Sequence, residues 1–231
     1  QQRTAGGADR RAELARGRWL LFLDDDDRPA PEWLPRFRHA IAEHPCAVLI
    51  SCGVRYVDPS DTVVRVRPPE ALGPSFRHVT GCFTGGATAV AADAFASIGG
   101  FRPEQPTSHM TELVLRLLAG LEDPTTQVAW IDEPLVDIHV APPNQRPRND
   151  PARLLAGSLY ILEAHADLIE RDRHVVARYT GVAGVAAARS GDPALARRLL
   201  WRSFVAEPER AAAGRLLVAC IGPLRRRRWA A

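Results

Sequence analysis

Residues 19–27 read Trp19-Leu20-Leu21-Phe22-Leu23-Asp24-Asp25-Asp26-Asp27, five apolar residues followed directly by four aspartates. A short, continuous apolar run predicts a strand that is covered on both faces of a sheet. Adjacent carboxylates repel one another and resist losing their water, so a cluster at the end of a buried strand indicates a bound cation. Carboxylate oxygens prefer Mg²⁺ or Mn²⁺, which usually share their coordination with substrate phosphates. We therefore expect a divalent metal ion, Mn²⁺ or Mg²⁺, and a phosphorylated ligand at this strand end, where α/β proteins bind ligands.

The same acids have a simpler interpretation as a solvated loop that leads into a helix. Pro31 suits the first helical turn, and Leu34, Phe37 and Ile41 recur at helical spacing. Acidic residues before a helix also interact favourably with its positive end. This stretch by itself leaves both interpretations open.

Composition restricts the classes of protein and of partner. The 231 residues, of which 46% are hydrophobic, are enough for one sizeable domain and a smaller appendage. The net charge is only +3 and the basic residues, all of them arginine, are scattered, so we expect no nucleic-acid partner. Four cysteines without metal-ligand spacing indicate a reducing cytoplasm, and no apolar run approaches the length of a transmembrane segment. The predicted location is the cytoplasm, either free or peripheral to the inner face of the membrane.

Alternating helical and strand patterns predict an α/β fold with a mixed, mostly parallel sheet flanked by helices. We expect this domain over residues 1–140, a Pro-rich linker over 141–152, and a helical bundle or hairpin over 153–231. Within the first domain, residues 68–82 lack a clear period and are expected to form a loop that covers or lines the site. We expect helices over residues 9–16, 94–98 and 112–121, and a further helix that begins near Pro31. We expect strands over residues 19–23, 47–51, 62–66 and 127–131, and an extended segment over 133–139.

The strand followed by the acids and Pro31-Glu32-Trp33-Leu34 resembles family 2 glycosyltransferases of GT-A fold, whose metal-binding DXD motif ends a strand in this way. Three further segments resemble the family and keep its order: residues 86–101, the helix Glu112-Leu113-Val114-Leu115-Arg116-Leu117, and Glu133-Pro134-Leu135 through His139. The resemblance covers residues 7–140. An ordered set of motifs is more specific than any one of them.

The resemblance implies transfer of a sugar from a nucleotide-diphosphate sugar to a hydroxyl acceptor of unknown kind, usually with inversion. Asp24 and Asp26 match the first and last acids of DXD, and the implied donor-binding residues are Asp24, Asp25 and Asp26 together with Gly85 and Gly86. Paired glycines also have the simpler interpretation of a tight turn.

His139 completes the expected set of metal ligands, Asp24, Asp26 and His139. The resemblance implies that its ring contacts the metal or the diphosphate. A lone histidine near the end of a strand is more often structural, and both roles stay open.

The position of the general base departs from the family pattern. The acidic pair before the Leu-x-x-Arg-Leu helix falls on His109-Met110, and a methionine cannot accept a proton. His109 and Glu112 are the nearby candidates for the catalytic residue. Glu112 has the alternative role of stabilising the helix N-terminus, and His109 that of an exposed loop residue.

The start of the chain also departs from the family, because the opening nucleotide-binding strands are missing and Gly7-Ala8-Asp9 replaces the usual Ala-Arg-Asn element. We therefore expect a fragment, a truncated product or a degenerate paralogue. The alternative function is a catalytically inactive GT-A-like binding or scaffolding protein.

The C-terminal part carries no second catalytic cluster. Residues 191–208 resemble half of a tetratricopeptide-like hairpin, which we expect to pack instead of forming a free repeat array. The basic terminus from Arg225 to Arg228 predicts either peripheral contact with anionic lipid or a charged, solvated chain end.

Overall fold

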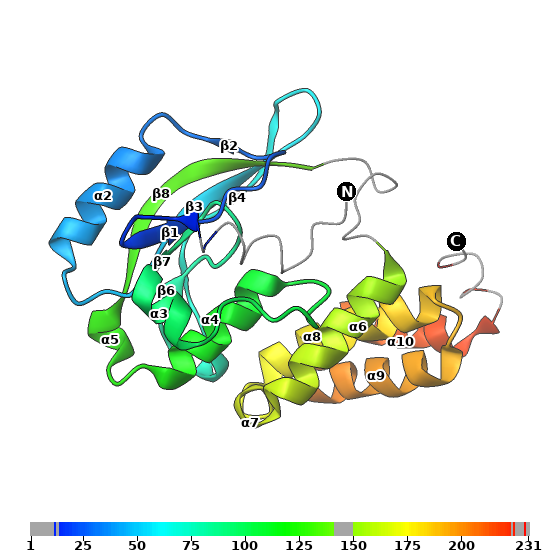
Figure 1. The fold of residues 1–231 in the computed structure, drawn as a ribbon. Coiled ribbons are helices and arrows are strands. Elements are labelled where there is room, and N and C mark those ends of the chain that lie inside the picture. The colour runs from blue at the N-terminus through cyan, green and yellow to red at the C-terminus, as the bar shows by residue number, and fades with distance from the viewer. Residues whose placement is uncertain (1–11, 13, 141–149, 223, 225–228, 230–231) are drawn as a thin grey trace. The chain divides into compact units, whose positions relative to one another are not determined.

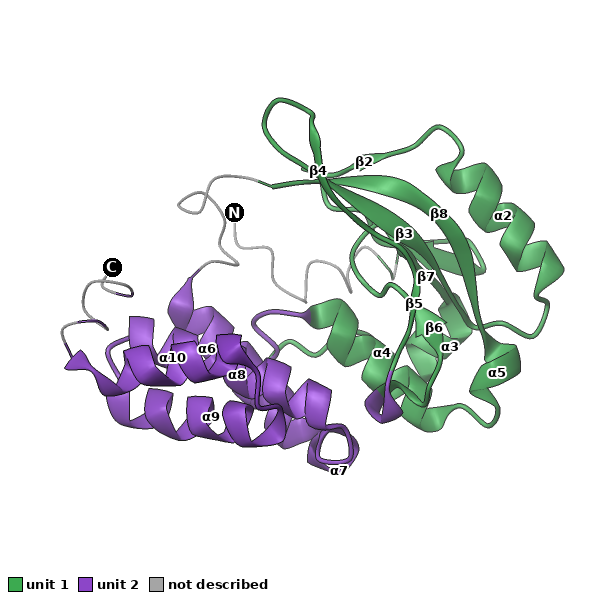
Figure 2. Ribbon diagram, turned by 180° about the vertical axis from the view of Figure 1, so that it is seen from behind, with its two compact units in different colours: residues 1–72, 76–104, 109–142 green, residues 73–75, 105–108, 143–231 purple. Residues whose placement is uncertain are grey.

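A computed structural model of the chain describes residues 12, 14–140, 150–222, 224 and 229. Its contacts divide the chain into two compact units, drawn in different colours in Figure 2. The sheet unit comprises residues 1–72, 76–104 and 109–142, and the helical unit comprises residues 73–75, 105–108 and 143–231. Only residues 12 and 14–16 of the helix expected at 9–16 are described, and most of the linker expected at 141–152 lies outside the described residues. The predicted domain boundaries remain a prediction.

The sheet unit is built on a six-stranded sheet with the order β1-β7-β3-β8-β2, in which β4 pairs with β3 beyond this path (Figure 1). β3 and β8 run parallel, whereas the other described pairs in this sheet are antiparallel. The predicted mixed α/β architecture is confirmed, with less parallel pairing than expected. The pairing of β3 with β4 is antiparallel because only a short connection joins them, and a short hairpin can join only antiparallel strands. The strands are β1 (Trp19–Leu21), β2 (Arg28–Pro29), β3 (Leu49–Val57), β4 (Val63–Arg67), β7 (Thr88–Ala91) and β8 (Val128–His139).

The central strand β3 is longer than predicted and is buried along most of its length. Its pairing with β8 shifts register around Gly53, which lies opposite Pro134. A Cβ atom at Gly53 would lie 3.2 Å from the carbonyl oxygens of Arg67 and Glu133, so the close approach of the two neighbouring strands requires glycine there. This irregularity explains why the sequence predicted two segments where the structure has the single strand β8.

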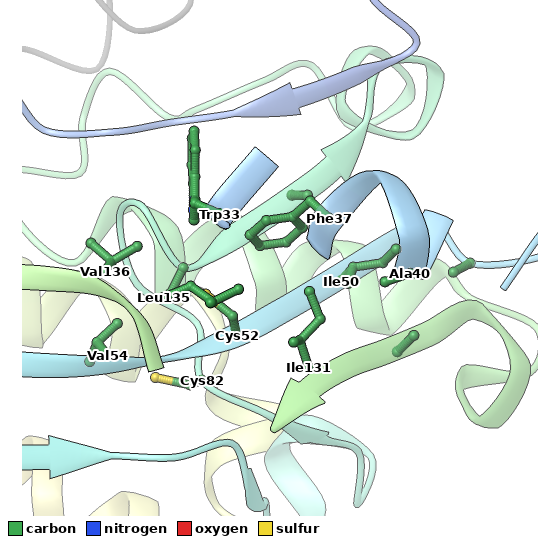
Figure 3. Packing of buried hydrophobic residues seen from close by; sticks show 14 of the residues in the cluster. Trp33, Phe37, Ala40, Ile50, Cys52, Val54, Cys82, Ile131, Leu135 and Val136 are labelled. Atoms are coloured by element: carbon green, nitrogen blue, oxygen red, sulfur yellow. The ribbon is translucent and has the colours of Figure 1, made fainter. Parts of the chain in front are cut away.

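Helix α2 (Trp33–Glu43) packs against β8 and closes one core of the sheet unit (Figure 3). It buries Trp33, Phe37 and Ala40. Leu34, which the sequence placed on the apolar face, is 54% exposed. Trp33 is buried in its place because the Trp33 indole is held inside by a hydrogen bond, described below with the site.

A second core of the sheet unit forms around α4 (His109–Gly120), whose buried residues include Leu113, Leu117 and Leu118. This helix begins three residues earlier than predicted, at His109. The predicted loop at 68–82 contains the two-stranded sheet of β5 and β6. The remaining short elements are β5 (Glu70–Ala71), η1 (Pro74–Phe76), β6 (Thr80–Gly81), α3 (Ala92–Ser97) and α5 (Pro124–Gln127).

The described part of the chain from residue 150 onward is mainly helical, as predicted, with a break between two helices at His165. Asp150, Asp172 and Asp192 cap α6, α8 and α9 by accepting hydrogen bonds from backbone N–H groups. Gly184 lets α8 and α9 approach closely, because a Cβ there would lie 2.6 Å from Leu200 Cγ. The helices are α6 (Pro151–Ala164), α7 (Ala166–Ile169), α8 (Arg173–Arg189), α9 (Pro193–Ala206) and α10 (Arg210–Cys220).

Membrane contact was predicted only for the basic terminus. No helix among the described residues is both long and apolar enough to cross a bilayer. The predicted lipid-contacting segment from Arg225 to Arg228 lies outside the described residues.

The four cysteines differ in burial, which predicts their reactivity. Burial raises the pKa of Cys52 to about 12 and also raises the pKa of Cys82, so neither forms the reactive thiolate near neutral pH. Cys46 and Cys220 are exposed.

We expect an aromatic disulfide reagent at pH 8 to titrate the thiols of Cys46 and Cys220 in the native protein and all four thiols after denaturation. Rapid reaction of Cys52 or Cys82 in the folded chain would contradict the described burial of these two residues.

Candidate active site at the end of β1

The acidic run forms a tight turn after β1. The backbone N–H of Asp27 donates to the carbonyl of Asp24 at 3.1 Å, which folds the acids back on one another. Asp24, Asp26 and Asp27 each offer a carboxylate oxygen, and these oxygens all lie within 4.8 Å of one another. Asp24 and Asp26 are exposed and Asp27 is half-buried, so an ion from solvent can reach the group. Three clustered carboxylate oxygens with room for water fit the preferences of Mg²⁺ and Mn²⁺.

Compared with the metal ligands expected from the sequence, this group of carboxylates contains Asp27 in place of His139. Asp24 and Asp26 belong to it, whereas Asp27 was expected only as part of the acidic cluster and was not named among the metal ligands. Asp25, predicted to bind the donor, lies in the same turn but outside the group. Alternation along the run could not distinguish these residues, because a turn does not keep the two-residue period of a strand.

Gly85 and Gly86 lie beside the acids, as the resemblance implied. A Cβ at Gly85 would lie 3.3 Å from Asp24 Oδ2. Gly86 has a φ of +73° and donates its N–H to the carbonyl of Phe22. Its own carbonyl accepts a hydrogen bond of 2.7 Å from Trp33 Nε1. The glycine pair therefore joins the end of β1 to α2, and Trp33 is a positioning residue to which the sequence gave no role.

His139 ends β8, the strand that pairs with β2 directly after the acids. Its Nε2 atom is 3.3 Å from Asp61 Oδ1, and the same oxygen is 3.6 Å from Arg28 Nη1. Among the described residues, the carboxylates that could share an ion are those of the turn, and His139 is not grouped with them. The metal-ligand role of His139 therefore stays a prediction, beside its observed contact with Asp61.

Glu112 is a buried partner of Arg116. Its side chain is 2% exposed, and its two carboxylate oxygens accept hydrogen bonds of 2.7 Å from Arg116 Nε and Nη2. Arg116 also donates to the carbonyls of Ile98 and Gly100, at 2.7 and 2.6 Å. The pair therefore fastens α4 to the turn that follows α3. A carboxylate held in this way at both oxygens is poorly placed to accept a proton from a substrate.

His109, the other candidate for the base, is half-buried at the start of α4. Its ring lies 6.3 Å from that of Phe101, and Phe101 in turn packs edge-on against Phe22 at 5.0 Å. Phe22 precedes Asp24 by two residues, so this aromatic row connects His109 with the strand end that carries the acids. Met110, which stands where the family has an acid, is buried in the second core.

The N-terminal part of the chain matches a known sequence family. Residues 2–98 match the family described as Glycosyl transferase family 2. The match covers less than half of the chain, and it agrees with the predicted resemblance to family 2 over these residues. A search of curated protein sequences found no match.

Solved structures of glycosyltransferases resemble this chain in fold. The chain of S. aureus TarS 1-349 in complex with UDP-GlcNAc is 12% identical, with a TM-score of 0.51, and the match covers 90% of this chain and 67% of that one. A mannosyltransferase from Pyrobaculum calidifontis, PcManGT, in complex with GDP-Man and Mn²⁺, is 18% identical over 97% of this chain and 62% of that one, with a TM-score of 0.47. The likeness to TarS agrees with the predicted GT-A-type fold.

Two glycines with similar backbone angles allow a matched test of the turn beside the acids. A Cβ at Gly86 would lie 2.9 Å from Val136 Cγ1 and 3.0 Å from Leu23 Cδ1, whereas one at Gly99, with a φ of +72°, would meet nothing within 4 Å. Both Ala variants carry the strain of a positive φ, but only Gly86→Ala adds crowding, which costs about 1–3 kcal/mol in well-packed regions. We expect urea denaturation to show this additional loss for Gly86→Ala. Equal losses in the two variants would contradict the described packing of Gly86.

Proposed function

We propose that this chain transfers a sugar from a nucleotide-diphosphate sugar to an acceptor hydroxyl in a metal-dependent, inverting reaction. The observation that carries the proposal is the group of three carboxylate oxygens at the end of β1, in residues that match glycosyltransferase family 2. UDP-sugars are the first donors to test, because the solved TarS chain with the similar fold is in complex with UDP-GlcNAc.

We assign metal binding to Asp24, Asp26 and Asp27. A divalent ion supplies Lewis-acid stabilisation of the charge that develops on a diphosphate leaving group. The missing side chain at Gly85 leaves space beside Asp24, so a ligand can approach the backbone there. We place the diphosphate on this side of the acids, and Asp25, exposed in the same turn, remains a candidate contact for the donor.

His109 is the better placed of the two predicted bases. Its Nδ1 atom is buried, so Nε2 is the atom that would take the proton from the acceptor hydroxyl. Glu112 instead acts through Arg116, by fixing the start of the helix that carries His109. Inversion requires only this base and a displaced nucleotide, without a covalent sugar intermediate on the chain.

A catalytically inactive binding protein is the second candidate. It is favoured by the buried Met110 at the family's acidic position and by the engagement of Glu112 with Arg116. Such a protein would keep metal-dependent nucleotide binding without turnover. The experiments below separate binding from turnover.

The metal site has a matched control within its own turn. We expect Asp26→Asn to weaken Mn²⁺ binding by at least about tenfold, because one of three ligand oxygens loses its charge. Asp25→Asn removes the same charge from the same turn and should leave Mn²⁺ affinity nearly unchanged. Calorimetric titration with Mn²⁺ alone measures both.

Nucleotide binding is then measured by thermal denaturation. UDP or GDP should raise the melting temperature only with Mn²⁺ present, since a ligand at 100 times its Kd stabilises the native state by about 2.7 kcal/mol. Equal Mn²⁺ affinities for Asp25→Asn and Asp26→Asn, or stabilisation by nucleotide that does not need Mn²⁺, would overturn the proposed site.

Turnover and stability should respond differently to changes at the two predicted bases. His109→Gln is expected to lower turnover by about two to four orders of magnitude, with little change in donor binding or stability. Glu112→Gln should mainly lower the free energy of unfolding, by about 1–3 kcal/mol, because Arg116 loses its buried charged partner. Donor hydrolysis and urea denaturation measure the two effects. Normal turnover in His109→Gln would eliminate His109 as the base, and absence of turnover in the unmodified chain would favour the binding protein.

A further inference from the structure

The helical unit contains a cationic groove that the sugar-transfer site does not use. It has a volume of about 400 Å³ and is lined by residues of α6, α8 and α10. This volume lies in the range of small-molecule sites. The groove lies wholly within the helical unit, so it stands whether or not the chain transfers a sugar. The lining residues are Leu154, Ala177, Arg178, Gly181, Val182, Val185, Ala186, Arg189 and Arg215.

Charge and apolar surface are separated along the groove. Arg178, Val182, Val185 and Arg189 recur at helical spacing on one face of α8. The two arginines are separated by about 16 Å along the helix axis, at 1.5 Å per residue, with the valines between them. None of the described residues that line this groove is acidic. A ligand that fills it must therefore present a negative charge at an arginine and an apolar body to the valines.

Arg215 marks the end of the groove nearer Arg178. Its Nε atom is buried and has no hydrogen-bond partner in the described part of the chain. A Cβ at Gly181 would lie 3.8 Å from Arg215 Nη2, so the missing side chain leaves room beside the guanidinium. Because Nε itself is closed to solvent, an oxyanion in the groove would meet this guanidinium at Nη2, beside Gly181.

The acids nearest to Arg215 lie on its other side. A smaller hollow of about 170 Å³ shares Arg178 and Arg215 with the groove and is also lined by Glu207 and Glu209. Glu207 Oε1 is 2.8 Å from His174 Nδ1, so this carboxylate already has a partner. Glu209 is exposed to solvent. Neither acid lines the larger groove, where the arginines remain the charged groups.

We infer that the groove between α6, α8 and α10 binds an amphiphilic oxyanion, a phosphate or carboxylate attached to an apolar body. The oxyanion lies at Arg178 and Arg215, and the apolar body lies along Val182 and Val185. Arginine suits this role because its planar guanidinium matches the geometry of phosphate and carboxylate oxygens. A soluble metabolite and a single lipid molecule share this chemistry.

Three probes test the two halves of this ligand by calorimetry with the whole chain, without metal or nucleotide. Octyl phosphate, below its micelle concentration, should bind. Inorganic phosphate should bind at least about tenfold more weakly, because it lacks the apolar body. Octyl glucoside, which lacks the charge, should not bind detectably. Binding of octyl glucoside or inorganic phosphate as tight as that of octyl phosphate would overturn the assignment, as would failure of octyl phosphate to bind.

Substitutions then locate the site. Arg215→Met and Arg178→Met each keep most of the side-chain stem and remove the charge, and we expect each to weaken octyl phosphate binding by at least about tenfold. Arg210→Met is the matched control, because Arg210 is exposed on the same helix as Arg215 and does not line the groove.

Thermal denaturation shows whether Arg215→Met lowers the stability of the chain. If it does, Arg178→Met still tests the groove, because Arg178 is exposed. Unchanged affinity in Arg178→Met, or an equal loss in Arg210→Met, would overturn the proposed site. Because these titrations contain neither Mn²⁺ nor nucleotide, their outcome is separate from that of the proposed sugar transfer.

Discussion

The backbone at Gly86 fixes the position of the acidic turn. Its N–H donates a hydrogen bond to the carbonyl of Phe22, and its own carbonyl accepts one from the indole of Trp33. The end of β1, the turn before β7 and the start of α2 therefore meet at this residue. Such a junction needs a left-handed backbone and no side chain, because Val136 and Leu23 occupy the space where a Cβ would lie. The acids begin only two residues after Phe22. Four repelling charges can stay together there because the backbone on either side of the turn is held by buried hydrogen bonds.

The buried pair of Glu112 and Arg116 shows how a carboxylate can lie near an active site without being free to act as a base. Burying an ion pair carries a desolvation cost that only good geometry offsets. Here the geometry is bidentate, and Arg116 also satisfies two backbone carbonyls in the turn after α3. Removing the carboxylate would leave a buried cation, so the pair has a sufficient structural reason to exist. That reason makes His109, and not Glu112, the group whose chemistry decides between an enzyme and a binding protein.

The sequence predicted the elements whose signal is local. The apolar run before the acids, the glycine pair and the α4 pattern all predicted the correct type of structure, because burial and backbone freedom appear directly in residue type. On the apolar face of α2 it was right for Phe37 and Ile41 and wrong for Leu34, because periodicity cannot show that the neighbouring Trp33 bonds to a carbonyl 53 residues away. The contact of His139 with Asp61 likewise joins segments far apart in the chain. No spacing rule carries that information.

The two proposed sites would recognise negative charge by opposite means. At the acidic turn, a phosphate would be repelled by Asp24, Asp26 and Asp27 unless a divalent ion lay between them, so binding there is coupled to the metal. In the groove of the helical unit, the guanidinium groups meet an oxyanion directly and need no ion. A chelator therefore weakens ligand binding at the first site and leaves the second unaffected. Added salt competes most strongly at exposed charges, such as those of Arg178 and Arg189, while the partly buried Arg215 is screened less. An anion that binds this chain without a metal is thus explained by the arginines, and one that requires a metal by the aspartates.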